Sequence, residues 1–310
     1  MWIGLIQLVI GLIVLILGGE FLIQSSVKLA RYFKVDPIVI GLTIISFGTS
    51  FPELVVSLNA ALSGHPDISL GNVVGSNIAN LALVLGVASV IKPISVSLDT
   101  QRIDWPLLIF ITIVFLLTAW FWEFSLYAGV VYVLLLLAYN FFMMRRGKLT
   151  ADEVEEVQVI DSKGQMIRTA LILILSFIAL IFGSDVLVDG AVAIAQFWDV
   201  EESVIAVTII AFGTSVPELA TSLIAIRRGE LGLGVGNLIG SNIFNVLGIV
   251  GITSLFETLV INDHLLNFDL WLCSVLPVFI FPFIIIQKSI SRGLGFILLA
   301  SYLGYILYFF

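Results

Sequence analysis

The stretch FGTSFPELVVSL (residues 47–58) occurs a second time, nearly unchanged, as FGTSVPELATSL (residues 212–223). A second pair follows at the same offset of 165 residues: LGNVVGSNIANLALVLG (70–86) matches VGNLIGSNIFNVLGIVG (235–251). Each copy of the first motif places one carboxylate, Glu53 or Glu218, inside a long apolar run. An ionisable group at membrane depth is costly and usually functional. Two at equivalent repeat positions predict one binding site built from two halves.

The composition indicates a membrane protein. Hydrophobic residues make up 60% of the 310 residues and charged residues 12%, whereas a soluble domain carries roughly 25% charged residues. Apolar runs of about 20 residues, long enough to cross a bilayer, recur along the chain. We therefore predict an all-α polytopic membrane protein in contact with the lipid bilayer, with no nucleic-acid partner. The N-terminal run MWIGLIQLVIGLIVLIL lacks a basic n-region and a cleavage site, so we expect a retained first span.

The apolar runs predict ten transmembrane helices. A linker, residues 145–165, separates a first five-helix repeat (1–144, motif region 41–86) from a second (166–310, motif region 206–251). The predicted spans are Trp2–Gln24, Asp36–Leu62, Ser69–Ile91, Ile103–Trp122, Ser125–Met144, Met166–Leu187, Ser203–Ile226, Leu233–Leu255, Leu270–Ile286 and Gly293–Phe310.

The basic residues predict the orientation. All 14 lysines and arginines fall in, or within three residues of, connections that follow odd-numbered spans. Basic loops face the cytoplasm, so we expect both termini outside the cell and the linker inside. Five spans per half is an odd number, so the second repeat is expected to be inverted. Inverted repeats around a midplane site are typical of secondary transporters. The short linker without a regulatory domain suggests a prokaryotic plasma membrane.

The first motif predicts a broken helix. Pro52 lacks an N–H and clashes with the preceding turn, and Gly48 permits unusual backbone angles. We expect span 2 to consist of one half-helix ending near Ser46 and another starting near Pro52, with span 7 broken in the same way. The break frees carbonyl oxygens, which a membrane tolerates only where they are buried in protein or line a cavity. Glu53 then lies beside these carbonyls and the hydroxyls of Thr49 and Ser50.

The second motif adds more oxygen ligands. Ser76 and Asn80 are four residues apart and share one helical face. The second half repeats this set with Thr214, Ser215, Glu218, Ser241 and Asn245. The pooled site has two carboxylates, hydroxyls, amides and carbonyls, but no His or Cys. Such ligands favour Ca²⁺, which takes 6–8 oxygens, over transition metals. Two carboxylates neutralise one Ca²⁺, and Na⁺ can compete for the same charge. Mg²⁺ fits less well because it dehydrates reluctantly.

Plainer interpretations exist for several acidic residues. One G-T-S-x-P-E motif alone is compatible with an ordinary kinked helix whose protonated glutamate bonds to a neighbour; the second copy at one offset favours a site. Glu20 and Asp185, also equivalent at this offset, either line an ion vestibule or lie near helix ends in water, and we favour the second.

The two motif pairs resemble the α1 and α2 repeats of the cation/Ca²⁺ exchanger superfamily, in particular prokaryotic sodium/calcium exchangers. The resemblance covers essentially the whole chain. It implies ten helices in two inverted five-helix repeats, with helices 2, 3, 7 and 8 as the core and helices 1 and 6 as a sliding gate pair. It also implies electrogenic exchange of Na⁺ for Ca²⁺ through four clustered cation sites, without a cofactor.

The resemblance also assigns roles to individual residues. Glu53 and Glu218 fall at the calcium-coordinating carboxylates, and Asn80 and Asn245 fall at the last ligand position of each repeat. Asn245 departs from relatives that carry Asp there, which argues against K⁺ dependence and removes a protonation site. The remaining positions are pore hydroxyls and carbonyls (Thr49, Ser50, Thr214, Ser215), serines of sodium sites (Ser76, Ser241) and backbone carbonyls (Ser46, Ala211).

The chemistry leaves alternative functions open. A Ca²⁺/H⁺ antiporter of the same superfamily would use the same glutamates as proton carriers. A passive cation channel is a further alternative, although two compact half-sites suit occlusion better than a wide pore. An intramembrane enzyme is not favoured, because no nucleophile or His accompanies the glutamates.

Overall fold

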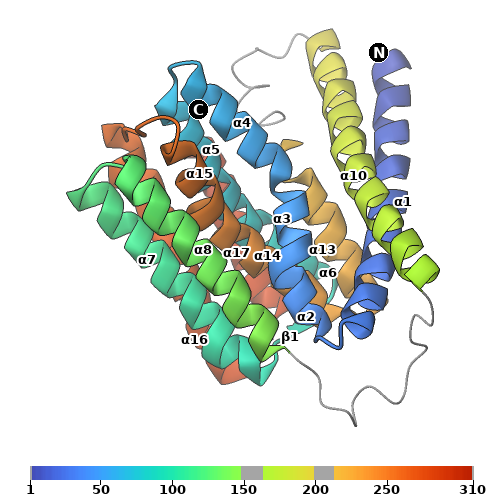
Figure 1. Cartoon of the computed structure of the whole chain (residues 1–310). Helices are drawn as coiled ribbons and strands as arrows, with labels where there is room; N and C mark the ends of the chain where they lie inside the picture. The colour runs from blue at the N-terminus through green and yellow to red at the C-terminus, as the bar shows by residue number, and fades with distance from the viewer. Residues whose placement is uncertain (1, 148–162, 199–212, 309–310) are drawn as a thin grey trace. The chain divides into compact units, whose positions relative to one another are not determined.

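The computed structural model describes residues 2–147, 163–198 and 213–308, which form helices joined by short turns and two very short strands (Figure 1). Seven of the described helices are long and apolar enough to cross a membrane, or eight if Pro37–Thr49 and Phe51–Leu62, bent at Ser50, count as one span. The chain is therefore an all-helical, multi-span membrane protein. Of the other predicted spans, Gly293–Phe310 corresponds to a helix of 17 residues, and the first part of Ser203–Ile226 lies outside the described residues.

The chain forms two compact units, and each takes segments from both predicted repeats. Unit 1 comprises Met1–Thr49 and Met143–Asn237, and unit 2 comprises Ser50–Phe142 and Leu238–Phe310. Unit 1 contains α1 (Trp2–Tyr32), α2 (Pro37–Ile40), the π-helix η1 (Gly41–Ile45), α3 (Ser46–Thr49), α10 (Lys163–Phe197), α13 (Val216–Arg228) and the start of α14 (Leu231–Phe244).

Glycines allow α1 and α10 to pack backbone to backbone in unit 1. A Cβ atom added at Gly11 would lie 2.6 Å from the backbone nitrogen of Leu187, and one added at Gly190 would lie 2.7 Å from the carbonyl oxygen of Gly4. Small residues are the usual means of close helix approach in a membrane, where the hydrophobic effect does not drive association. The two long helices therefore run side by side (Figure 1).

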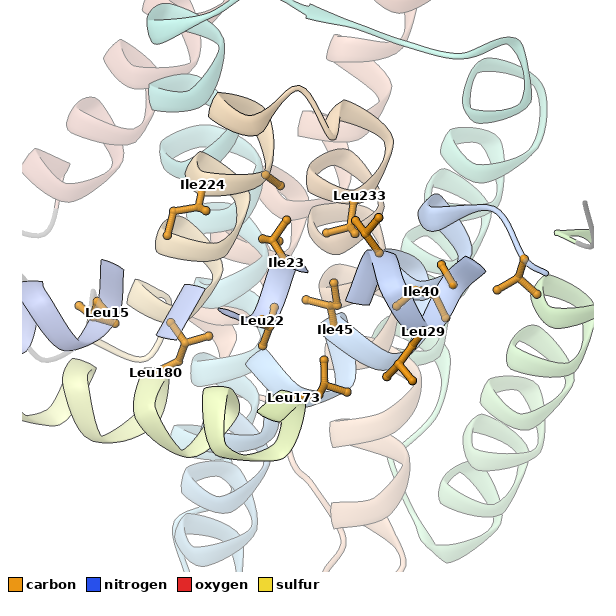
Figure 2. Packing of buried hydrophobic residues seen from close by; sticks show 14 of the residues in the cluster. Leu15, Leu22, Ile23, Leu29, Ile40, Ile45, Leu173, Leu180, Ile224 and Leu233 are labelled. Atoms are coloured by element: carbon orange, nitrogen blue, oxygen red, sulfur yellow. The ribbon is translucent and has the colours of Figure 1, made fainter. Parts of the chain in front are cut away.

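The core of unit 1 joins α1 to the shorter helices. Leu22 and Ile23 of α1 are at most 1% exposed and belong to one cluster with Ile45 of η1, Ala225 of α13 and Leu233 of α14 (Figure 2). The start of α2 is capped by the residues next to it. The Asp36 carboxylate accepts a hydrogen bond of 2.9 Å from the backbone N–H of Ile38, and Pro37 follows at the first helical position, where its missing N–H costs nothing.

Unit 2 is a second helical bundle. Its two short strands pair antiparallel, with Ile94 opposite Ile290, and the Trp105 indole N–H donates to the carbonyl oxygen of Pro277 at 2.9 Å. Its elements are α4 (Phe51–Leu62), α5 (Pro66–Ile78), η2 (Ala79–Val84), α6 (Leu85–Ile91), β1 (Ile94–Ser95), η3 (Thr100–Asp104), α7 (Trp105–Phe121), most of α8 (Leu126–Arg146), the end of α14, η5 (Asn245–Val250), α15 (Gly251–Ser254), η6 (Leu265–Asp269), α16 (Leu270–Gln287), β2 (Ser289–Ile290) and α17 (Arg292–Tyr308).

Local structure recurs at the sequence offset of 165 residues. The π-helices η3 and η6 begin at Thr100 and Leu265, which are equivalent positions. Ser50 and Ser215, also equivalent, directly precede α4 and α13 and have nearly identical backbone angles (φ −86° and −87°, ψ 7° and 1°). The repeat therefore extends from residue identity to backbone geometry. π-Helical turns are also frequent at functional sites.

The helix before the first break is longer than predicted. The sequence suggested an end near Ser46, but α3 continues to Thr49. Three hydroxyls bond back to carbonyls of the same helical segment: Thr43 to Val39, Ser46 to Thr43 and Thr49 to Ile45. Such bonds satisfy buried hydroxyls and often bend a helix, and here they occur in the segment that leads to the bend at Ser50.

We expect Gly11→Val to destabilise the protein by about 1–3 kcal/mol or more, because overpacking against backbone atoms forces the two helices apart. Thermal unfolding in detergent measures the change. Gly304→Val is the matched control, since no described residue lies within 4 Å of a Cβ atom at Gly304. Equal losses for both variants would contradict the proposed backbone contact between α1 and α10.

Candidate ion-binding site

Each unit holds one buried glutamate in the first turn of a helix that begins directly after a serine, Ser50 or Ser215. Glu53 lies in the first turn of α4 and Glu218 in the first turn of α13, and both are 0% exposed. Pro52 and Pro217 occupy the same turns, where a proline fits because the N–H is not needed. The positive end of the helix dipole favours a carboxylate there. The sequence therefore places both carboxylates in the same local geometry.

Unit 2 carries Glu53 together with five other predicted ligands. The helix of Glu53, α4, packs against α5 and against η5. Predicted ligands in this unit are Ser50, Glu53, Ser76, Asn80, Ser241 and Asn245, and each is at most 5% exposed. Both polar atoms of the Asn80 side chain are buried without a hydrogen bond to any described residue. Buried amides normally have partners, so this amide is suited to a ligand.

Unit 1 carries the other predicted ligands. These are Ser46, Thr49, Thr214, Ser215 and Glu218, whereas Ala211 lies outside the described residues. The Thr49 hydroxyl lies 3.1 Å from the carbonyl oxygen of Ile45 and 3.2 Å from Oδ1 of Asn237. The Thr214 and Ser215 hydroxyls are buried and make no hydrogen bond within the described part of the chain. This half also consists of oxygen ligands around one carboxylate.

In both units, the asparagine at the start of the second motif is hydrogen-bonded to a residue of the first motif. In unit 2, Asn72 Nδ2 donates to Ser57 Oγ at 2.9 Å and to the carbonyl oxygen of Glu53 at 3.2 Å. In unit 1, the equivalent Asn237 Nδ2 donates to the equivalent Ser222 Oγ at 3.2 Å. These four residues were missed in the sequence analysis. The signal was present, because all four recur at the same offset and each serine lies one helical turn beyond its glutamate.

The donor set is chemically uniform. Among the described residues, no group of three or more His, Cys, Asp or Glu side chains gathers where it could hold a metal. The buried groups are instead single carboxylates with hydroxyls, amides and carbonyls. Hard oxygen ligands select Ca²⁺ or Na⁺ over transition metals. The residues present fit a transported hard cation.

Glu20 lies elsewhere than expected. It is within α1, twelve residues before the helix ends at Tyr32, and it forms an ion pair with Arg228 at the end of α13. The predicted position near a helix end is therefore wrong for Glu20, although its side chain is 29% exposed beside Arg228. Asp185 lies inside α10, one turn before Asp189. The offset that relates Glu20 to Asp185 therefore does not give them the same environment.

Comparisons with known proteins agree with these observations. The sodium/calcium exchanger protein family matches the chain twice, over residues 3–145 and 168–310. The chain is 33% identical to a putative antiporter, CaxA, of Alkalimonas amylolytica, over 98% of both proteins. It is 29% identical to the sodium/calcium exchanger MaX1 of Methanosarcina acetivorans, over 98% of this chain and 97% of that protein.

A solved structure of the sodium-calcium exchanger NCX_Mj superposes with a TM-score of 0.86 and 31% identity, covering 99% of both chains. The same exchanger soaked with Na⁺ and Ca²⁺ superposes with a TM-score of 0.84 and 32% identity, over 98% of this chain and 97% of that one. With a family match over both halves and relatives along the full length, this chain belongs to the sodium/calcium exchanger protein family.

Proposed function

We propose that this protein is a secondary active antiporter that exchanges Na⁺ for Ca²⁺ across the membrane by alternating access, and that it has no enzymatic activity. One observation carries the proposal. In a member of the sodium/calcium exchanger family, the two equivalent glutamates are both 0% exposed in the first turn of their helices. A buried carboxylate in a membrane protein is typical of an ion pathway, and the neighbours of both glutamates are hard oxygen ligands.

The proposed architecture has ten transmembrane helices in two inverted five-helix repeats, with helices 2 and 7 broken at the midplane. Three observations support it: the restriction of all basic residues to alternate connections, the offset of 165 residues, and the recurrence of the Ser50 and Ser215 breaks at that offset. In this architecture the protein lies in the plasma membrane, and the basic connections face the cytoplasm. Both termini are then extracellular. Residues 145–165 form a cytoplasmic linker between the repeats.

The proposed site combines the two half-sites. Glu53 and Glu218 are the two carboxylates that neutralise one Ca²⁺. The other proposed ligands are the hydroxyl groups of Thr49, Ser50, Thr214, Ser215, Ser76 and Ser241, the amides of Asn80 and Asn245, and the backbone carbonyls of Ser46 and Ala211. Two observations support the combination: the equivalence of the two halves in sequence, and the full burial of the glutamate in each half.

The proposed mechanism follows from charge balance. Ca²⁺ or Na⁺ ions compete for overlapping oxygens around a fixed charge of −2, so the two loads exclude one another. A loaded site is neutralised and can be enclosed, whereas an empty site leaves two carboxylates that resist removal from water. The protein therefore changes between outward-open and inward-open states only when loaded. Exchange, and not leakage, is the consequence.

We expect Glu53→Gln and Glu218→Gln each to reduce Na⁺-gradient-driven Ca²⁺ uptake into proteoliposomes on the order of a hundredfold, because removing one charge from a buried site costs several kcal/mol. Radioactive Ca²⁺ uptake measures the rate. Glu257→Gln makes the same chemical change at an exposed residue and is the control. Retention of wild-type uptake by either site variant would refute the assignment.

The driving ion separates the proposal from the alternative, a Ca²⁺/H⁺ antiporter that uses the same glutamates. We expect an outward-directed Na⁺ gradient to drive Ca²⁺ uptake when a protonophore has collapsed the pH gradient. A pH gradient without Na⁺ should drive none, since Na⁺ is the competing load. Uptake driven by the pH gradient alone would favour the alternative.

A further inference from the structure

Asn77 belongs to the second motif but has no role in the proposed ligand set. It is 1% exposed and lies at the end of α5, three residues before Asn80. Its repeat equivalent is Asn242, and the two lie in direct contact within unit 2: Asn77 Nδ2 donates to the backbone carbonyl oxygen of Asn242 at 3.3 Å. On its other side, Asn77 Oδ1 accepts a hydrogen bond of 3.1 Å from Nδ2 of Asn245.

The order of donors and acceptors in this chain is fixed. A backbone carbonyl oxygen only accepts hydrogen bonds, so the carbonyl of Asn242 requires Nδ2 of Asn77 on its side. Oδ1 of Asn77 then faces Asn245. Because Oδ1 also only accepts, Asn245 must present its own Nδ2 to Asn77. Turning over either amide would bring two acceptors together and lose a buried hydrogen bond.

The consequence falls on the oxygen of Asn245. With Nδ2 held by Asn77, Oδ1 of Asn245 points away from this contact, and it is buried without a hydrogen bond to any described residue. A buried amide oxygen with no partner is suited to a cation.

We propose that Asn77 is a positioning residue that locks the Asn245 amide with its oxygen directed to the transported cation. The inference rests on the proposed function, because it gives Asn245 its value as a Ca²⁺ ligand. Asn77 itself contacts no ion. Asn77 holds the Asn245 amide in the orientation that presents its oxygen, and not its NH₂ group, to the cation. This orientation raises the affinity of the site for Ca²⁺.

The two repeats differ at this point, which supplies a matched control. The Asn242 side chain does not hold Asn80 in the described structure; its Nδ2 donates to the carbonyl oxygen of Leu238, one turn back in its own helix. Asn242→Leu therefore removes only that local bond and leaves the backbone carbonyl that orients Asn77. Asn77→Leu removes the lock. The two substitutions are chemically identical and occupy equivalent positions.

The test measures the KM for Ca²⁺ and the kcat of Na⁺-driven uptake in proteoliposomes. We expect Asn77→Leu to raise the KM roughly three- to tenfold, the range for losing one hydrogen bond, with kcat changed by less than about twofold. Asn242→Leu should change the KM by less than about twofold. Asn77→Ser, too short to reach both partners, is measured beside Asn77→Leu in case leucine prevents folding.

A double-mutant cycle distinguishes positioning from general stability. If Asn77 acts through Asn245, then adding Asn77→Leu to Asn245→Ala should raise the KM no further. Independent, multiplying effects in the double variant would overturn the inference, as would equal effects of Asn77→Leu and Asn242→Leu. The proposed function fails separately: it fails if the wild-type protein shows no Na⁺-dependent Ca²⁺ uptake, whereas this inference fails with wild-type uptake intact.

Discussion

A carboxylate that is fully buried at a helix break is the constraint on which the rest of this protein depends. Glu53 and Glu218 are each withdrawn from solvent in the first turn of a helix. The dipole of one helix stabilises a charge by about 0.3–1 kcal/mol at the surface and up to about 2 kcal/mol when partly buried, whereas burying an ion costs several kcal/mol after relaxation. The helix dipole alone does not offset this cost. The proposed antiport assigns the compensating charge to the transported cations.

The surrounding packing serves to keep the breaks in place. In both units an asparagine of the second motif bonds to a serine one turn beyond the glutamate, so the broken helix is tied to its neighbour at the same point in each half. A further close contact in unit 1 joins η1 to α14. A Cβ atom on Gly41 would lie 2.6 Å from the carbonyl oxygen of Leu233. Hydrogen bonds between helices persist in lipid because no water competes for the groups.

Sequence reasoning could predict features that depend on residue identity alone. The repeated Pro and Glu predicted the bend at Ser50 and the two buried glutamates, and the apolar runs predicted the membrane class. Sequence reasoning could not predict features that depend on contacts across the fold or on the exact end of a helix. The pairing of Glu20 with Arg228 joins residues 208 apart, and α3 extends to Thr49. The lock on Asn245 depends on which amide atom faces which carbonyl.

The central claim is that the two glutamates hold one Ca²⁺ between them, and binding stoichiometry tests it most directly. Isothermal titration of the purified protein with Ca²⁺ in Na⁺-free detergent solution should give one high-affinity Ca²⁺ per chain. Glu53→Gln alone and Glu218→Gln alone should each abolish that single binding event. Two Ca²⁺ per wild-type chain, with each variant keeping one, would show two independent sites and contradict the account.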